Sequence, residues 1–124
     1  MQGRLNKILL FLSCVGLFAC VTKAVSQENE HLRDLIHEYG YKGWYNVEYN
    51  INLDTAEYYL KKALDLQYAN YIVLDDRVAT NHVSLASVYR RLYNNSEALK
   101  HLNRAEEILN RYDPNSYLFG NIYN

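Results

Sequence analysis

The sequence has little proline and little cysteine, with one proline and two cysteines among 124 residues. Because proline interrupts helices, its scarcity leaves room for long helical segments. There is also no excess of basic residues, because 13 basic and 14 acidic residues give a formal charge of -1, and this argues against binding to nucleic acid. The charged fraction of 22% and the hydrophobic fraction of 49% are ordinary for a globular chain, so intrinsic disorder is not expected.

The first 26 residues have the composition of an export signal. Met1 to Lys7 contain two basic residues and no acidic one, and an apolar run follows from Ile8 to Val21. A charged start and a short apolar segment are typical of a secretory signal, whereas a relaxed membrane span needs about 20 apolar residues. The sequence therefore predicts an exported protein, either periplasmic or extracellular.

Three outcomes of processing remain open. Small residues at positions 24 and 26 allow signal peptidase to remove residues 1–26 as a signal peptide. Residues 16–20 resemble a bacterial lipobox, although Phe18 is unusual there; cleavage at that site would remove residues 1–19 and leave a membrane-anchored lipoprotein with lipid on Cys20. The third outcome is an uncleaved anchor. Palmitate labelling that is abolished by Cys20→Ser would identify the lipoprotein.

Removal of residues 1–26 changes the composition. Three basic residues and no acidic one are lost, so the formal charge falls from -1 to -4. Both cysteines, Cys14 and Cys20, lie in the removed segment. The remaining domain therefore cannot use a disulfide framework, a cysteine-based zinc site or a cysteine nucleophile.

Apolar residues then recur every three or four positions, which is the period of amphipathic helices. One stripe contains Ala98, Leu102, Ala105, Leu109 and Tyr112, and another contains Leu85, Ala86, Tyr89, Leu92 and Tyr93. A turn at 94–96 and a stop at 113–115 predict a hairpin of two helices, over residues 78–93 and 96–112. Ala56, Leu60 and Ala63 repeat the first stripe 42 residues earlier, and Asp54 is the predicted cap of a helix that continues towards Ile72.

The pattern Leu85-Ala86-x-x-Tyr89, followed by Ala98-x-x-x-Leu102-x-x-Ala105 and a late Pro114, resembles the tetratricopeptide repeat (TPR) family. Two departures are Tyr93, where the family commonly has glycine, and the poorly matching segment 43–47. Gly40 and Gly43 are expected to weaken their helix by about 1 kcal/mol each relative to alanine. The resemblance implies an all-α fold of antiparallel helix hairpins stacked as a short α-solenoid.

The predicted organisation is a signal peptide (1–26), a degenerate TPR-like repeat (27–74), a second repeat (75–114) and the start of a truncated third repeat (115–124). Because each repeat buries its apolar face on its neighbours, Phe119 and Ile122 are expected to be poorly covered. Three explanations remain open. The chain is an N-terminal fragment of a longer repeat-containing sensor or regulatory protein, its reading frame is truncated, or it self-associates through its uncapped C-terminal end.

The sequence offers no recognisable catalytic constellation, so we expect a non-catalytic protein without cofactor or metal. His31 and His37 are six residues apart, which places them on different faces of a helix, unlike the i, i+4 pair of a helical zinc site. Neither a glycine-rich phosphate loop nor the glycines of a nucleophile elbow are found.

The TPR resemblance implies a ligand groove lined by the first helices of successive repeats. Candidate groove residues are Tyr41, Tyr45, Tyr49, Val83, Ser87, Arg90 and Arg91. Tyrosine offers a large contact area with a hydroxyl group, although tyrosines that only pack and arginines that are only solvated are the alternatives. The predicted function is a scaffold at the cell envelope that binds a protein or peptide and contacts membrane only through lipid at Cys20. The alternative is a lipid-anchored binder of small molecules or glycans.

Overall fold

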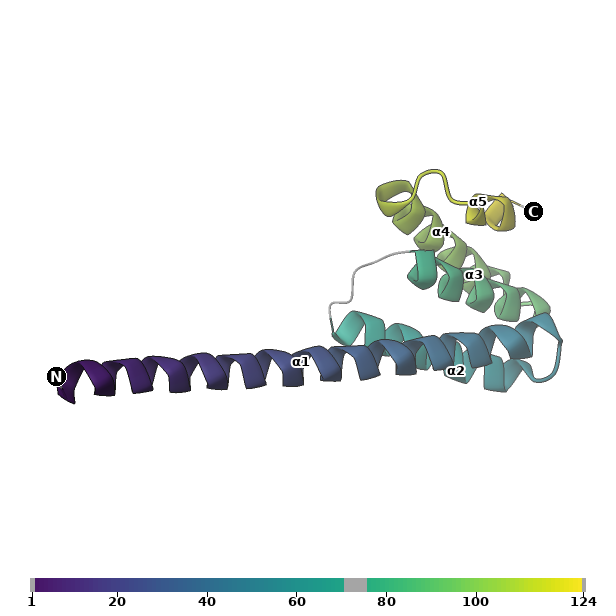
Figure 1. The fold of residues 1–124 in the computed structure, drawn as a ribbon. Coiled ribbons are helices and arrows are strands. Elements are labelled where there is room, and N and C mark those ends of the chain that lie inside the picture. The colour runs from purple at the N-terminus through teal and green to yellow at the C-terminus, as the bar shows by residue number, and fades with distance from the viewer. Residues whose placement is uncertain (1, 71–75, 124) are drawn as a thin grey trace. The chain divides into compact units, whose positions relative to one another are not determined.

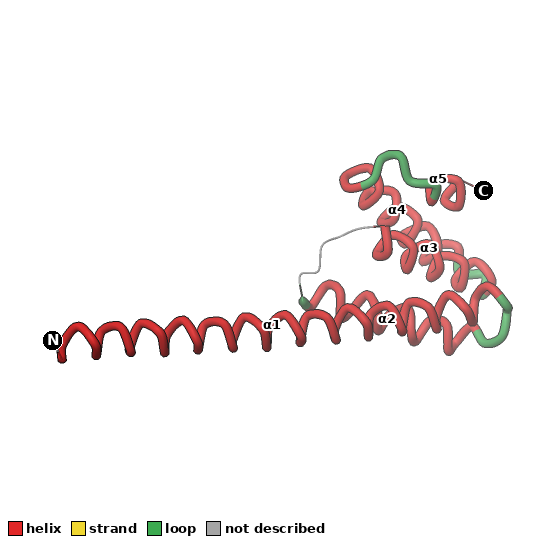
Figure 2. The backbone as a smooth tube through the Cα atoms, in the orientation of Figure 1, coloured by secondary structure: helices red, strands yellow, loops and turns green. Residues whose placement is uncertain are grey.

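The structure is a computed structural model and describes residues 2–70 and 76–123. Every regular element in these two ranges is a helix. The helices are α1 (Gln2–Glu48), α2 (Leu53–Ala69), α3 (Asp76–Arg91), α4 (Asn95–Tyr112) and α5 (Leu118–Tyr123) (Figure 1, Figure 2). The prediction of an all-α chain is confirmed for this part of the sequence.

The chain divides into two compact units, unit 1 (Met1–Asp34) and unit 2 (Leu35–Asn124). Unit 1 holds the first part of α1, in which the large apolar side chains from Leu5 to Val25 are exposed. One 18-residue window of this helix has a mean hydropathy of 2.3, so α1 is long and apolar enough to cross a membrane by length and composition. Both predicted cleavage positions fall within this helix.

Unit 2 contains two antiparallel helix hairpins. In the first, residues 35–48 of α1 pack on α2, and the rings of Tyr39 and Tyr59 lie 5.7 Å apart. In the second, α3 and α4 lie side by side (Figure 1), and α5 packs against both. The predicted helices 78–93 and 96–112 therefore correspond to α3 and α4, each within two residues at both ends.

Apolar side chains from all five helices form the core of unit 2. Its members are Val47, Ala56, Leu60, Leu64, Val78, Ala79, Leu85, Ala86, Val88, Tyr89, Ala98, Ala105, Ile108, Leu109 and Leu118. Phe119 and Ile122 are partly buried and pack against this core. The expectation that these two residues would be poorly covered is therefore wrong, because α5 folds back on α3 and α4.

In both hairpins, the first helix ends with the same turn geometry. Asn50 follows α1 with a φ of 50°, and Tyr93 follows α3 with a φ of 58°. Beyond Tyr93, the amide of Asn94 donates to the carbonyl oxygen of Tyr89 at 2.8 Å, and an equivalent bond follows Asn50. Both turns are Schellman motifs, in which a left-handed residue lets the last carbonyls of the helix be satisfied.

The second helix of each hairpin starts at an asparagine. The side chain of Asn52 accepts a hydrogen bond from the amide of Thr55 at 2.8 Å, and Asn94 accepts one from the amide of Glu97 at 3.3 Å. The prediction that Asp54 caps α2 is wrong, because Asn52 occupies the cap. Asp54 lies in the first turn, where its charge interacts favourably with the helix dipole.

Two further expectations about helix limits are corrected. The helix α2 ends at Ala69 rather than continuing towards Ile72, which lies outside the described residues together with the predicted repeat boundary at 74–75. Leu92 and Tyr93 do not extend the buried stripe of α3. They are 43% and 93% exposed because the chain has already turned away from the core there.

Replacement of Tyr93 by glycine is expected to stabilise unit 2. Tyr93 occupies a left-handed conformation that costs a side-chain-bearing residue about 1 kcal/mol, and its ring is almost fully exposed. We expect Tyr93→Gly to raise the free energy of unfolding by about 0.5–1 kcal/mol, measured by urea denaturation. The matched control is Tyr117→Gly, at an exposed tyrosine without positive φ, which should not stabilise; equal gains in both variants would contradict the explanation.

Candidate groove between α1, α3 and α5

A groove of about 450 Å³ opens between α1, α3 and the start of α5 in unit 2. It is lined by Trp44, Val47, Glu48, Thr80, Val83, Ser84, Ser87, Arg90, Tyr117 and Leu118. Trp44 is the only tryptophan of the chain, so its fluorescence would report directly on this groove.

The groove exists because the unit 2 part of α1 and the helix α3 run parallel and close together. Gly40 faces Asn81 near one end, where a Cβ on the glycine would lie 2.9 Å from the Asn81 side-chain oxygen. At the other end, Nη1 of Arg91 donates to the carbonyl oxygen of Val47 at 2.5 Å. The corresponding ends of the two helices therefore meet, and one face of each borders the groove.

Part of the groove lining is polar. Glu48 and Arg90 are exposed, and neither side chain has a hydrogen-bond or ion-pair partner in the part of the chain that the structure describes. The hydroxyls of Thr80 and Ser87 donate to carbonyl oxygens of their own helix at 2.8 and 3.2 Å, which leaves their lone pairs free to accept hydrogen bonds.

The apolar part of the lining includes Trp44, Val47 and Leu118 with the ring of Tyr117. A lining of apolar side chains, hydroxyls and one charge of each sign can bind a ligand that has both apolar side chains and polar backbone groups.

Three predicted groove residues, Val83, Ser87 and Arg90, line this groove. They come together because they are spaced by four and three residues on α3 and so share one face. Thr80 and Ser84 also line the groove, and the same helical spacing on α3 could have predicted this. Tyr117 could not be inferred, because its position depends on how α5 folds back.

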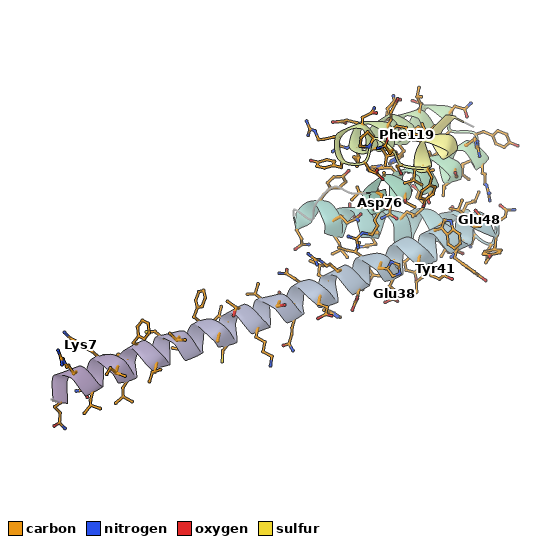
Figure 3. All side chains as sticks on the ribbon, turned by 45° about the horizontal axis from the view of Figure 1, so that its top comes forward. Lys7, Glu38, Tyr41, Glu48, Asp76 and Phe119 are labelled. Carbon is orange, nitrogen blue, oxygen red and sulfur yellow. The ribbon has the colours of Figure 1, made fainter. Side chains whose placement is uncertain are left out.

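The predicted tyrosines of α1 lie beside the groove rather than in its lining. Tyr41, Tyr45 and Tyr49 are 55%, 40% and 61% exposed, and together with Trp44 they form an exposed aromatic face. The rings of Tyr45 and Tyr49 are 4.6 Å apart. Figure 3 shows the side chains of Tyr41 and Glu48 projecting from the unit 2 part of α1.

The predicted groove residue Arg91 does not line the groove but connects α3 to the end of α1. Its guanidinium group donates to the carbonyl oxygen of Val47 and, at 3.2 Å, to Oδ1 of Asn50. These bonds give a hydrogen-bond donor to the Val47 carbonyl at the end of α1 and connect that end to the end of α3. Arg91 therefore helps to hold together the two helices that form the groove.

The other predicted site residue, Cys20, is exposed in unit 1, as is Cys14. Among the described residues, no group of three or more histidine, cysteine, aspartate or glutamate side chains could hold a metal ion.

No protein-family model matches the chain, and comparisons with curated proteins and with solved structures found no match either. The resemblance to TPR proteins therefore remains a prediction that rests on the residue pattern.

Proposed function

We propose that this chain is an exported, non-catalytic TPR-like module that binds a peptide segment of a protein partner at the cell envelope. The observation that carries the proposal is the groove between the parallel helices α1 and α3, because these are the first helices of the two hairpins. The mixed apolar and hydroxyl lining of the groove suits the alternating side chains and backbone groups of a peptide.

The length of the groove supports an extended peptide. Thr80 and Arg90 both line it and are ten residues apart on α3, which corresponds to about 15 Å at 1.5 Å per residue. An extended peptide advances about 3.3 Å per residue, so four or five residues would fill this length.

The correspondence between the two hairpins supports the repeat interpretation. The capping residues Asn52 and Asn94 are 42 residues apart, and so are the buried pairs Ala56 and Ala98 and Ala63 and Ala105. Small buried residues at equal positions let the paired helices approach each other equally, which stacked helix hairpins require.

The export part of the proposal is supported by unit 1. Its exposed apolar helix begins with basic residues, which fits a signal sequence, and its length would also allow the uncleaved anchor. Cleavage after Ser26 and lipid attachment at Cys20 both fall within Met1–Asp34, so either event leaves unit 2 unchanged.

Site-specific photocrosslinking in cells that produce the full chain would test peptide binding. Benzoylphenylalanine replaces Ser87 in the groove or, as the matched control, the exposed Asn103 of α4. We expect a discrete crosslinked protein adduct from position 87 and none from position 103. Identical adducts from both positions, or none from position 87, would contradict the proposal.

The charge of Arg90 provides the second arm of this test. Loss of a charge-assisted hydrogen bond should weaken binding roughly tenfold, so Arg90→Ala should reduce the adduct at position 87 strongly. Arg111→Ala is the control, because Arg111 is also exposed but lies at the end of α4, outside the groove lining.

A further inference from the structure

A pair of histidine side chains joins α3 to α4 within the core of unit 2. Nδ1 of His82 lies 2.8 Å from Nδ1 of His101, and the ring centroids are 5.1 Å apart. His82 is 6% exposed, whereas His101 is only partly buried. We call these two residues the imidazole pair.

Aromatic side chains enclose the imidazole pair and extend it to α2. The hydroxyl of Tyr68 lies 2.9 Å from Nε2 of His82. The ring of Tyr89 stacks on His101 with centroids 5.5 Å apart, and its hydroxyl donates to Oε1 of Glu57 at 2.7 Å. The pair therefore lies where α2, α3 and α4 meet.

The number of protons on the two rings decides whether the hydrogen bond between them can form. A hydrogen bond between two ring nitrogens needs one N–H group and one bare nitrogen. Two neutral rings satisfy this requirement, and one added proton can still be placed on an outer nitrogen. When both rings are protonated, two N–H groups and two positive charges face each other across the 2.8 Å contact. The contact is then repulsive.

The charged groups around the pair come from α2 and α4. Burial lowers the pKa of His82 to about 4, and His101 and Arg104 act in the same direction. Burial also lowers the pKa of His101; Glu97 and Glu57 oppose that shift, whereas Lys61 and Lys100 reinforce it. Both rings are thus neutral at neutral pH and take up protons in acid.

We propose that the imidazole pair is an acid-sensitive latch, which holds α3 and α4 together with α2 at neutral pH and releases them when both rings are protonated. The device goes beyond the proposed binding function and does not depend on it. Its exposure to external pH rests on the proposed export, and in an exported chain the latch would make the fold responsive to acid.

The stability of the full chain, kept in solution with a mild detergent, should depend on pH in a defined window. The pKa of His82 lies below 6.5 in the fold, so its contribution to stability is complete above pH 6.5 and is lost as the pH falls towards 4. Between about pH 7.5 and pH 5 this linkage raises the unfolding equilibrium constant roughly 30-fold. Urea unfolding followed by Trp44 fluorescence measures the change. Equal stability at the two pH values would overturn the proposal.

The variant His82→Gln should remove most of this pH dependence, because glutamine does not take up a proton. His37→Gln is the matched control, since His37 is exposed on α1 and should leave the dependence intact. Retention of the full dependence in His82→Gln would overturn the latch.

If His82→Gln does not fold, ring NMR signals of the unmodified chain decide the matter. His82 should still be neutral at about pH 5.5, well above its lowered pKa. A His82 ring that is already protonated at this pH would overturn the proposal.

Discussion

Replacement of Gly43 by alanine should lower the free energy of unfolding of unit 2 by about 1–3 kcal/mol, although alanine favours helices by about 1 kcal/mol over glycine. A Cβ atom at this position would lie 2.5 Å from Cγ of Leu60 and 3.1 Å from its backbone nitrogen. Leu60 is fully buried, so neither atom can move away cheaply. Overpacking should therefore outweigh the gain in helix propensity.

Gly120→Ala is the matched control for this prediction. A Cβ at Gly120 would have no atom within 4 Å, so the variant should show no loss of stability. Urea denaturation of both full-length variants, followed by Trp44 fluorescence, gives the comparison. A Gly43→Ala variant as stable as Gly120→Ala would show that α1 does not approach α2 as closely as the structure places it.

A double variant would connect the effect to Leu60. Leu60→Ala removes the Cγ atom that the new Cβ would strike, so Gly43→Ala should cost less in that background than in the unmodified chain. Strict additivity of the two substitutions would argue against the contact.

Truncation of Leu85 to alanine should lower the free energy of unfolding by about 2–5 kcal/mol. Leu85 is fully buried in the middle of α3, which packs against α2, α4 and α5. The loss combines the transfer free energy of the removed atoms with the cost of the cavity, since helices on several sides cannot all collapse into it. For a unit of this size the melting temperature should fall by roughly 10 °C or more.

Leu99→Ala is the control for Leu85→Ala. Leu99 is 58% exposed on α4, so its truncation removes little buried area and should change the free energy of unfolding by less than about 0.5 kcal/mol. Thermal denaturation followed by circular dichroism distinguishes the two variants. Similar melting temperatures for both would contradict the central position of α3.

Both predictions bear on the groove, because its walls depend on the same packing. Gly43 lies next to Trp44 in the sequence, and Leu85 lies next to Ser84, so each core position neighbours a groove residue. A shift of α1 away from α2, or of α3 into a cavity, would displace these groove side chains. Loss of binding in the two variants would therefore accompany loss of stability, unlike the loss expected for Arg90→Ala.

The sequence predicted the second hairpin well because its signals are local. The buried residues Ala98, Ala105 and Leu109 recur at helical spacing, and Asn94 both ends one turn and caps the next helix. Periodicity and capping act over a few residues, so they can be recognised without knowledge of the rest of the chain.

Which residue caps the N-terminus of α2 could be decided only from the structure. Asn52 and Asp54 are both good capping residues, and sequence spacing favoured Asp54. The left-handed residue Asn50 ends the preceding turn early, so the chain enters α2 two residues sooner.

The sequence alone determined an all-helical unit with one well-marked hairpin, preceded along the chain by an apolar N-terminal helix, because periodicity, caps and composition are local properties. The role of Gly43 depends on the tertiary structure. From the sequence, Gly43 is only a position that weakens its helix, whereas in the fold it lets α1 approach Leu60 of α2 closely. The tertiary structure also placed Arg91 at the end of α1 and brought His82 to His101 across 19 residues. These contacts depend on which helix faces meet, and that is set by the packing of the whole unit.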